Sequence, residues 1–137
     1  MSVIGLPLQW RLQAYNGAGA DATVTGAYRG VKLSTDGALA YASTDAMTGL
    51  FTTTTVANAA YLASDTVDNS ANLYLGAEIE VNVISTGGGD GSVTVYLQGA
   101  RSTGNWPDDG QGEVAVVVSS TDWSAESTAG VAATVLV

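Results

Sequence analysis

The sequence predicts an all-β fold, an antiparallel β-sandwich of jelly-roll type with about eight strands. Thr, Val, Ala, Ser and Gly dominate the composition, whereas charged helix formers are scarce, with only 4 Lys and Arg residues in total. The 17 glycines are scattered along the chain rather than placed in tandem. Short segments alternate between apolar and polar residues and are separated by turn residues, which is typical of half-buried strands.

The first strand pattern is the most regular one. Residues 8–15 (LQWRLQAY) alternate strictly, with Trp10 and Leu12 on one face and Gln13 and Tyr15 on the other. The turn residues NGAGAD follow directly and end the strand.

The next segments are also strand-like. Residues 22–34 (ATVTGAYRGVKLS) predict two short strands or one strand interrupted at Gly26 and Gly30. A TDG turn then leads into residues 38–43, which alternate again and complete a hairpin pattern.

The middle of the chain is less regular. Residues 51–56 (FTTTTV) favour a strand, because β-branched side chains fit a pleated surface. A short helix at Val56–Leu62 is left open, since VANAAYLA contains good helix formers.

The last third again has clear strand patterns. Residues 72–85 (NLYLGAEIEVNVIS) alternate, and Leu73 and Leu75 are the first inward positions of this pattern. Residues 92–101 repeat the alternation. Residues 114–120 (VAVVVSS) are apolar on both faces and therefore predict a strand in the middle of a sheet.

Two features of the sequence favour assembly. Free sheet edges are usually protected by Lys, Pro or charge, and this chain has a single Lys and 2 Pro residues. It also ends in the apolar residues TVLV. We therefore expect the last strand to lie within a sheet or to be covered by a neighbouring subunit, and a solitary monomer is disfavoured.

Charge and hydropathy restrict the partners. The chain has 13 acidic and 4 basic residues and a net charge of −9, so nucleic acid and anionic membranes are not expected as partners. No apolar run approaches the roughly 18 residues that span a bilayer, and the first residues lack a signal-peptide pattern. We expect one domain over residues 1–137 that is made in the cytoplasm.

The composition also excludes common catalytic and metal chemistry. The chain contains no His and no Cys, so Ser-His-Asp catalysis, thiolate nucleophiles and imidazole or thiolate metal sites are absent. Glu78 and Glu80 share one strand face, as paired catalytic carboxylates of a glycoside hydrolase could. A regular strand with one solvated side shows the same pattern, however. We expect no enzyme activity, no cofactor and no metal.

A calcium site in the loops is an alternative, because calcium needs only oxygen ligands. The carboxylates concerned are Asp90, Asp108, Asp109 and Glu113. Asp90 and Asp108 lie at opposite ends of the strand at residues 92–101 and cannot share an ion.

Two loop tryptophans are the first candidates for an interaction site. Trp106 and Trp123 could cap the core, anchor a protein interface or stack on a sugar ring. We assign Trp106, Trp123, Pro107 and the terminal apolar Leu136 as candidate interface residues.

Residues 91–120 (GSVTVYLQGARSTGNWPDDGQGEVAVVVSS) resemble a pattern in tailed-bacteriophage virion proteins, in which a sandwich strand is followed by a loop of the form D-G-x-T-W-P-x-x-G-x-G. The match covers about thirty residues, and this chain departs from it by having RSTGN before Trp106.

The resemblance implies a structural virion protein, most specifically a capsid decoration (cement) protein that stabilises a phage head. It implies a dimer or trimer that contacts major capsid or tail subunits. A tail or fibre component and a carbohydrate-binding sandwich that uses Trp106 and Trp123 are the alternatives, and calcium or glycan binding is left open.

Overall fold

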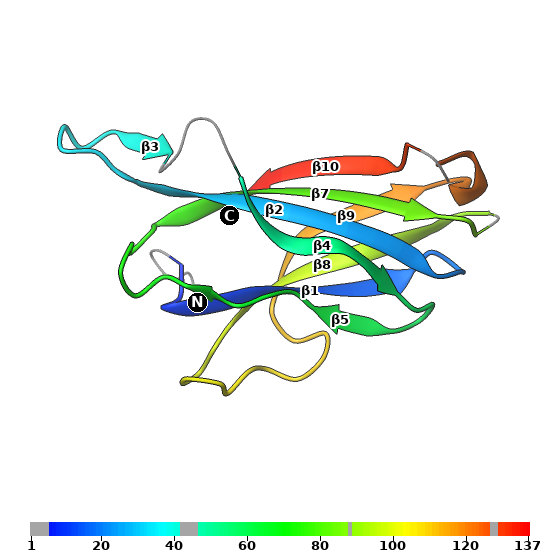
Figure 1. Ribbon diagram of the computed structural model, residues 1–137, viewed down its shortest axis with the longest axis horizontal. Coiled ribbons are helices and arrows are strands. Elements are labelled where there is room, and N and C mark those ends of the chain that lie inside the picture. Colours follow the sequence, from blue (N-terminus) through cyan, green and yellow to red (C-terminus); the bar gives the residue numbers. More distant parts are fainter. Residues whose placement is uncertain (1–5, 42–46, 88, 127–128) are drawn as a thin grey trace.

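The structure, a computed structural model, describes residues 6–41, 47–87, 89–126 and 129–137. In this part of the chain, two antiparallel sheets pack face to face, as Figure 1 shows. The predicted all-β sandwich is confirmed. One short 3₁₀ helix, η1, follows the ninth strand at Trp123–Glu126.

The first sheet has β1 and β8 at its centre. Its strand order is β5-β1-β8-β9, and β6 also pairs with β1. The bounds are β1 Gln9–Gly17, β5 Tyr61–Ala63, β6 Val67–Asp68, β8 Gly91–Gly99 and β9 Glu113–Ser120.

The second sheet has β7 and β2 at its centre. Its order is β10-β7-β2-β3, and β4 pairs with β2 on the same side as β3. The bounds are β2 Ala22–Leu33, β3 Leu39–Tyr41, β4 Thr48–Val56, β7 Gly76–Ser85 and β10 Val131–Leu136.

The core lies between the sheets and is made by the alternating apolar residues that the sequence indicates. Trp10, the largest of them, packs edge-on against Tyr28 with the ring centroids 5.1 Å apart. The fully buried apolar residues of the central strands are Trp10, Leu12, Ala14, Val24, Ala77, Ile79, Val81, Val83, Val93 and Val95.

The structure settles the two alternatives in the first half of the chain. Ala22–Leu33 form one strand, β2, whose pairing with β4 shifts register around Gly26. No helix forms at Val56–Leu62, because β4 runs to Val56 and β5 begins at Tyr61 after a short turn. The predicted strand at residues 38–43 is β3 as far as Tyr41, and residues 42–43 lie outside the described part.

Two predictions for the last third are wrong. Leu73 and Leu75 do not face the core, because β7 begins only at Gly76 and Leu73 lies in a turn with φ of 51°. Residues 114–120 are not central either: β9 is the edge of its sheet and, among the described residues, pairs with β8 alone.

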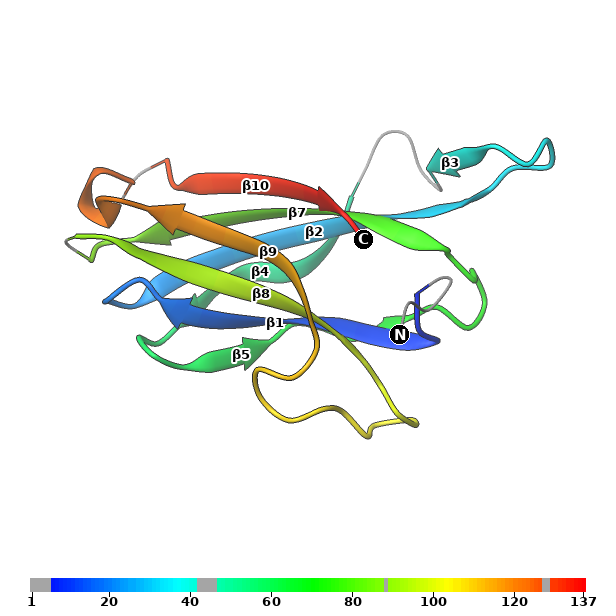
Figure 2. The same ribbon diagram turned by 180° about the vertical axis from the view of Figure 1, so that it is seen from behind.

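The last strand, β10, is likewise the edge strand of its sheet and not an interior strand. Figure 2 shows that the beginning of β10 lies beside the C-terminal end of β9. Away from this point the two strands diverge. One flank of the sandwich therefore carries two free edges.

Figures 1 and 2 also show that the hairpin of β2 and β3 projects beyond the body of the sandwich. We call residues 31–41 the arm. β3 pairs only with β2 in the described part of the chain, so the arm is a two-stranded ribbon.

Candidate functional site

The loop at residues 100–112 packs on the outer face of the sheet containing β1 and β8, and two buried glutamines hold it there. Figure 2 shows this sheet from its outer side, with the loop extending beyond β1 and β5. Gln13 of β1 and Gln98 of β8 are 2% and 0% exposed, although Gln13 alternates with core residues and points outward. Gln13 Nε2 donates to Asp109 Oδ1 at 2.6 Å, and the Gly110 N–H donates to Gln13 Oε1 at 2.9 Å.

Gln98 completes the anchor of the loop. Its Nε2 lies 3.1 Å from the carbonyl oxygen of Asp108 and 2.7 Å from that of Gln111. Its Oε1 accepts a hydrogen bond of 3.0 Å from Arg11 Nε. The buried amides are thus bound to loop atoms, which rigidifies the base of the loop.

Trp106 lies in this loop against Arg11, whose Cζ is 4.5 Å from the centroid of the indole ring. Burial lowers the pKa of Arg11, and the charge of Asp109 opposes this shift in part. Trp106 and Pro107 are both half-buried. The candidate interface residue Trp106 therefore helps to fix the loop and keeps part of its surface accessible.

Three tyrosines on the outer face of the same sheet border the loop. The rings of Tyr15 and Tyr61 are 4.7 Å apart between centroids, and Tyr96 lies on the neighbouring strand β8, directly opposite Gln13. Burial raises the pKa of Tyr61, and Tyr96, Tyr15 and Asp109 raise it further. We call Tyr15, Tyr61 and Tyr96 the tyrosine face.

The tyrosine face was not predicted from the sequence. Its sequence signal is that Tyr15 and Tyr96 take polar positions in the alternations of residues 8–15 and 92–101. Tyr61 lies in the segment for which a helix was left open, so its place next to Tyr15 could not be inferred.

Trp123 is not a surface residue, which corrects its assignment as an interface candidate. Its side chain is 0% exposed, and its backbone N–H donates to the carbonyl of Gly89 at 3.1 Å. Trp123 thus closes the core at the turn after β9, as the core-capping alternative expected. Because Trp106 lies on the outer face, the two tryptophans do not form a common site.

Leu136, the remaining candidate, is exposed at the end of β10 and lies next to the arm. A surface groove of about 170 Å³ is lined by Leu136, Leu39, Tyr41, Val31 and Ala40. Leu136 and Leu39 are 63% and 66% exposed. The structure therefore brings a predicted interface residue together with apolar residues of the arm.

An ion pair lies at the base of the arm. Arg29 donates to both carboxylate oxygens of Glu78, at 3.0 and 3.1 Å, and its Cζ lies 3.7 Å from the ring centroid of Tyr41. The Tyr41 hydroxyl and then the Arg29 guanidinium hold the pKa of Glu78 below its ordinary value. Glu78 therefore has a structural partner, whereas Glu80 on the same face is exposed.

The loop carboxylates do not converge. Asp109 binds Gln13, and Asp108 is exposed beside it. Within the described ranges, no group of three or more acidic, His or Cys side chains is placed to hold a metal ion.

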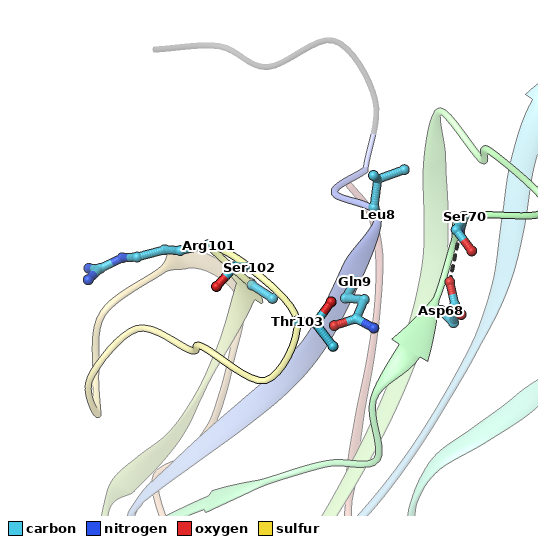
Figure 3. A pocket seen from close by; sticks show the side chains of 8 residues that line it. Leu8, Gln9, Asp68, Ser70, Arg101, Ser102 and Thr103 are labelled. Carbon is cyan, nitrogen blue, oxygen red and sulfur yellow. Dashed lines mark hydrogen bonds between the residues drawn. The ribbon is translucent and has the colours of Figure 1, made fainter.

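A larger groove of about 520 Å³ lies near the start of β1 (Figure 3). Ser70 donates its backbone N–H to Asp68 at 2.9 Å. The Ser70 side chain and then this backbone contact lower the pKa of Asp68. Figure 3 shows that the side chain of Arg101 extends away from Gln9 and Asp68. The guanidinium group of Arg101 therefore does not point into the groove.

Comparisons of the chain with protein-family models, curated proteins and solved structures found no match. None of the helices in the described part is long and apolar enough to cross a membrane.

Proposed function

We propose that this protein is a non-enzymatic structural protein of a virion, most specifically a capsid decoration protein that binds the major capsid protein of a phage head. The observation that carries the proposal is the groove between the arm and the end of β10, in which Leu39, Tyr41 and Leu136 stay accessible.

The arm needs a partner on physical grounds. A two-stranded ribbon is marginally stable in water when nothing packs against it. Leu33 and Leu39 of the arm are exposed, as is Leu136 beside it. Burying such a leucine contributes about 1–2 kcal/mol, so a protein surface that covers all three gains both affinity and an ordered arm.

The sequence supports the same proposal. Residues 106–112 match the W-P-x-x-G-x-G part of the virion pattern. The absence of His and Cys from the chain disfavours the usual catalytic groups.

Self-association fits the proposal as well. The free edges of β9 and β10 lie on one flank, and Val114 and Val117 of β9 are each about half exposed. A dimer or trimer that covers this flank would remove them from water, and native mass spectrometry measures the number of copies.

The test of the proposal is binding to particles. Phage particles assembled without this chain are mixed with the purified protein and sedimented, and the bound protein is quantified. We expect saturable binding to heads, strong loss of binding for Leu39→Lys, and retained binding for the control Thr35→Lys at the tip of the arm. Binding to tails alone would reassign the protein to the tail, and binding to neither would overturn the proposal.

A further inference from the structure

The tyrosine face lies beside the loop at residues 100–112, whose base is held in place by hydrogen bonds. The hydroxyl of Tyr61 is so close to Gly110 that a Cβ built on this glycine would lie 2.9 Å from it. Gly110 is held in turn by Gln13, whose side chain is nearly fully buried. Tyr61 of β5 and the loop are therefore in direct contact, and binding here requires little ordering of the protein.

The three rings extend over neighbouring strands. Tyr15 is directly opposite Tyr61 of β5 and Thr94 of β8, and Gln13 is opposite Tyr96. Tyr15 and Tyr96 are thus diagonal neighbours on one face, where aromatic side chains reach each other. Tyr61 is 38% exposed, and its ring is tilted by 40° to that of Tyr15. Tyr15 and Tyr61 therefore pack against each other, and with Tyr96 they form an aromatic cluster over three strands, the platform, in which the ring of Tyr61 is exposed.

The polar groups at the edge of the platform select the kind of ligand. Asp109 uses Oδ1 to accept the bond from Gln13, and Oδ2 has no protein partner among the described residues. The nearby cation, Arg11, donates from Nε to Gln98 and lies against the ring of Trp106. A carboxylate oxygen and tyrosine hydroxyls are available to hydrogen-bond a ligand.

We propose that the tyrosine face, with Asp109 at its edge, binds a neutral oligosaccharide. Sugar rings offer apolar C–H faces that stack on aromatic rings and hydroxyl groups that donate to a carboxylate, and this is the combination that the platform presents. The net charge of −9 repels anionic glycans at the same time. This site lies on a different surface from the arm and does not depend on the capsid role.

The test is binding of the full chain to a panel of neutral hexasaccharides, namely cellohexaose, xylohexaose, maltohexaose and chitohexaose, measured by titration calorimetry. We expect one of them to bind, with an affinity about tenfold lower in Tyr61→Ala. Tyr61→Phe keeps the ring and should lose less, and Asp109→Asn should lose several-fold. The control Tyr41→Ala removes an exposed tyrosine of the arm and should bind like the unmodified protein.

Three outcomes would overturn the inference: no binding to any of the four sugars, binding that Tyr61→Ala leaves unchanged, or binding only to sulfated or sialylated glycans. Circular dichroism of each variant shows that it is folded. If Tyr61→Ala abolishes binding to particles and no sugar binds, the tyrosine face is a protein interface. Loss of particle binding in Leu39→Lys together with retained sugar binding separates this site from the proposed capsid contact.

Discussion

The side chain of Gln98 donates a hydrogen bond of 2.7 Å to the main-chain carbonyl of Gln111, a residue of the loop that leads to the next strand. The buried side-chain amide of Gln98 on β8 thus binds a main-chain carbonyl of the loop, as a backbone N–H of a neighbouring strand would. The position of Trp106 and Asp109 depends on this contact.

We predict that Gln98→Leu destabilises the protein and frees the loop. The substitution leaves the carbonyl of Gln111 without its partner, at about 1–3 kcal/mol if it stays buried, and leaves the carbonyl of Asp108 with only the N–H of Gln111. Urea unfolding measures the loss, and limited proteolysis within residues 100–112 should become faster. Gln9→Leu, a half-buried glutamine of the same strand face as Gln13, is the control, and equal effects of the two changes would contradict the anchor.

The two tryptophans Trp123 and Trp106 should respond differently to truncation. Trp123→Ala removes a fully buried side chain and should cost about 3–5 kcal/mol of unfolding free energy. Trp106→Ala removes a half-buried side chain from the surface and should cost about 1 kcal/mol. Chemical denaturation of both variants measures the difference. A Trp123→Ala variant as stable as Trp106→Ala would show that Trp123 is not in the core.

The ion pair of Arg29 and Glu78 predicts a dependence of stability on pH. The pKa of Glu78 is lowered in the folded state, so its contribution is complete above the unfolded-state value and is lost as the pH falls through the folded-state pKa. Glu78→Gln should therefore be less stable than the unmodified protein at neutral pH, and this difference in stability should narrow as the pH falls below the unfolded-state value and vanish below the folded-state pKa. Thermal unfolding over this pH range measures it.

Glu80→Gln serves as the control for that experiment, because Glu80 lies on the same strand face and makes no ion pair in the described part of the chain. At neutral pH, Glu80→Gln should lose less stability relative to the unmodified protein than Glu78→Gln does. A pH-independent gap for Glu78→Gln would contradict the role of the ion pair.

Alanine substitutions at two glycines of the loop separate the contact with Tyr61 from the backbone strain that both substitutions cause. Gly104 and Gly110 have φ of 74° and 71°, so an alanine at either position costs about 1–2 kcal/mol of backbone strain. A Cβ at Gly104 meets no atom within 4 Å, whereas one at Gly110 meets the Tyr61 hydroxyl. Gly110→Ala should therefore be the more destabilising variant in urea unfolding. Equal losses would mean that Tyr61 does not pack against the loop.

The sequence predicts the sandwich well because its central strands bury one face each. Trp10 and Leu12 alternate with polar residues, and the structure buries both. The same rule fails where a regular pattern continues past the end of a strand, as at Leu73, which is 61% exposed in a turn. Periodicity alone does not show where the backbone leaves the sheet.

The candidate site was less accessible to prediction. Gln13 and Gln98 occupy outward positions that read as solvated, and their burial comes from a loop distant along the sequence from Gln13. The apolar pattern of residues 114–120 indicated a central strand, yet β9 is an edge. Both errors concern contacts between segments, which local patterns do not encode.

The anchored loop divides into a fixed base and a separate tip. The tip is a tight turn in which the Asn105 N–H donates to the carbonyl of Ser102 at 2.8 Å, and Gly104 within it has open space around it. The amides of Gln13 and Gln98 hold only the base, at residues 108–111. A foreign peptide inserted at Gly104 would thus be presented to solvent on a rigid stem, which makes this turn a natural attachment point for using the protein as a display scaffold.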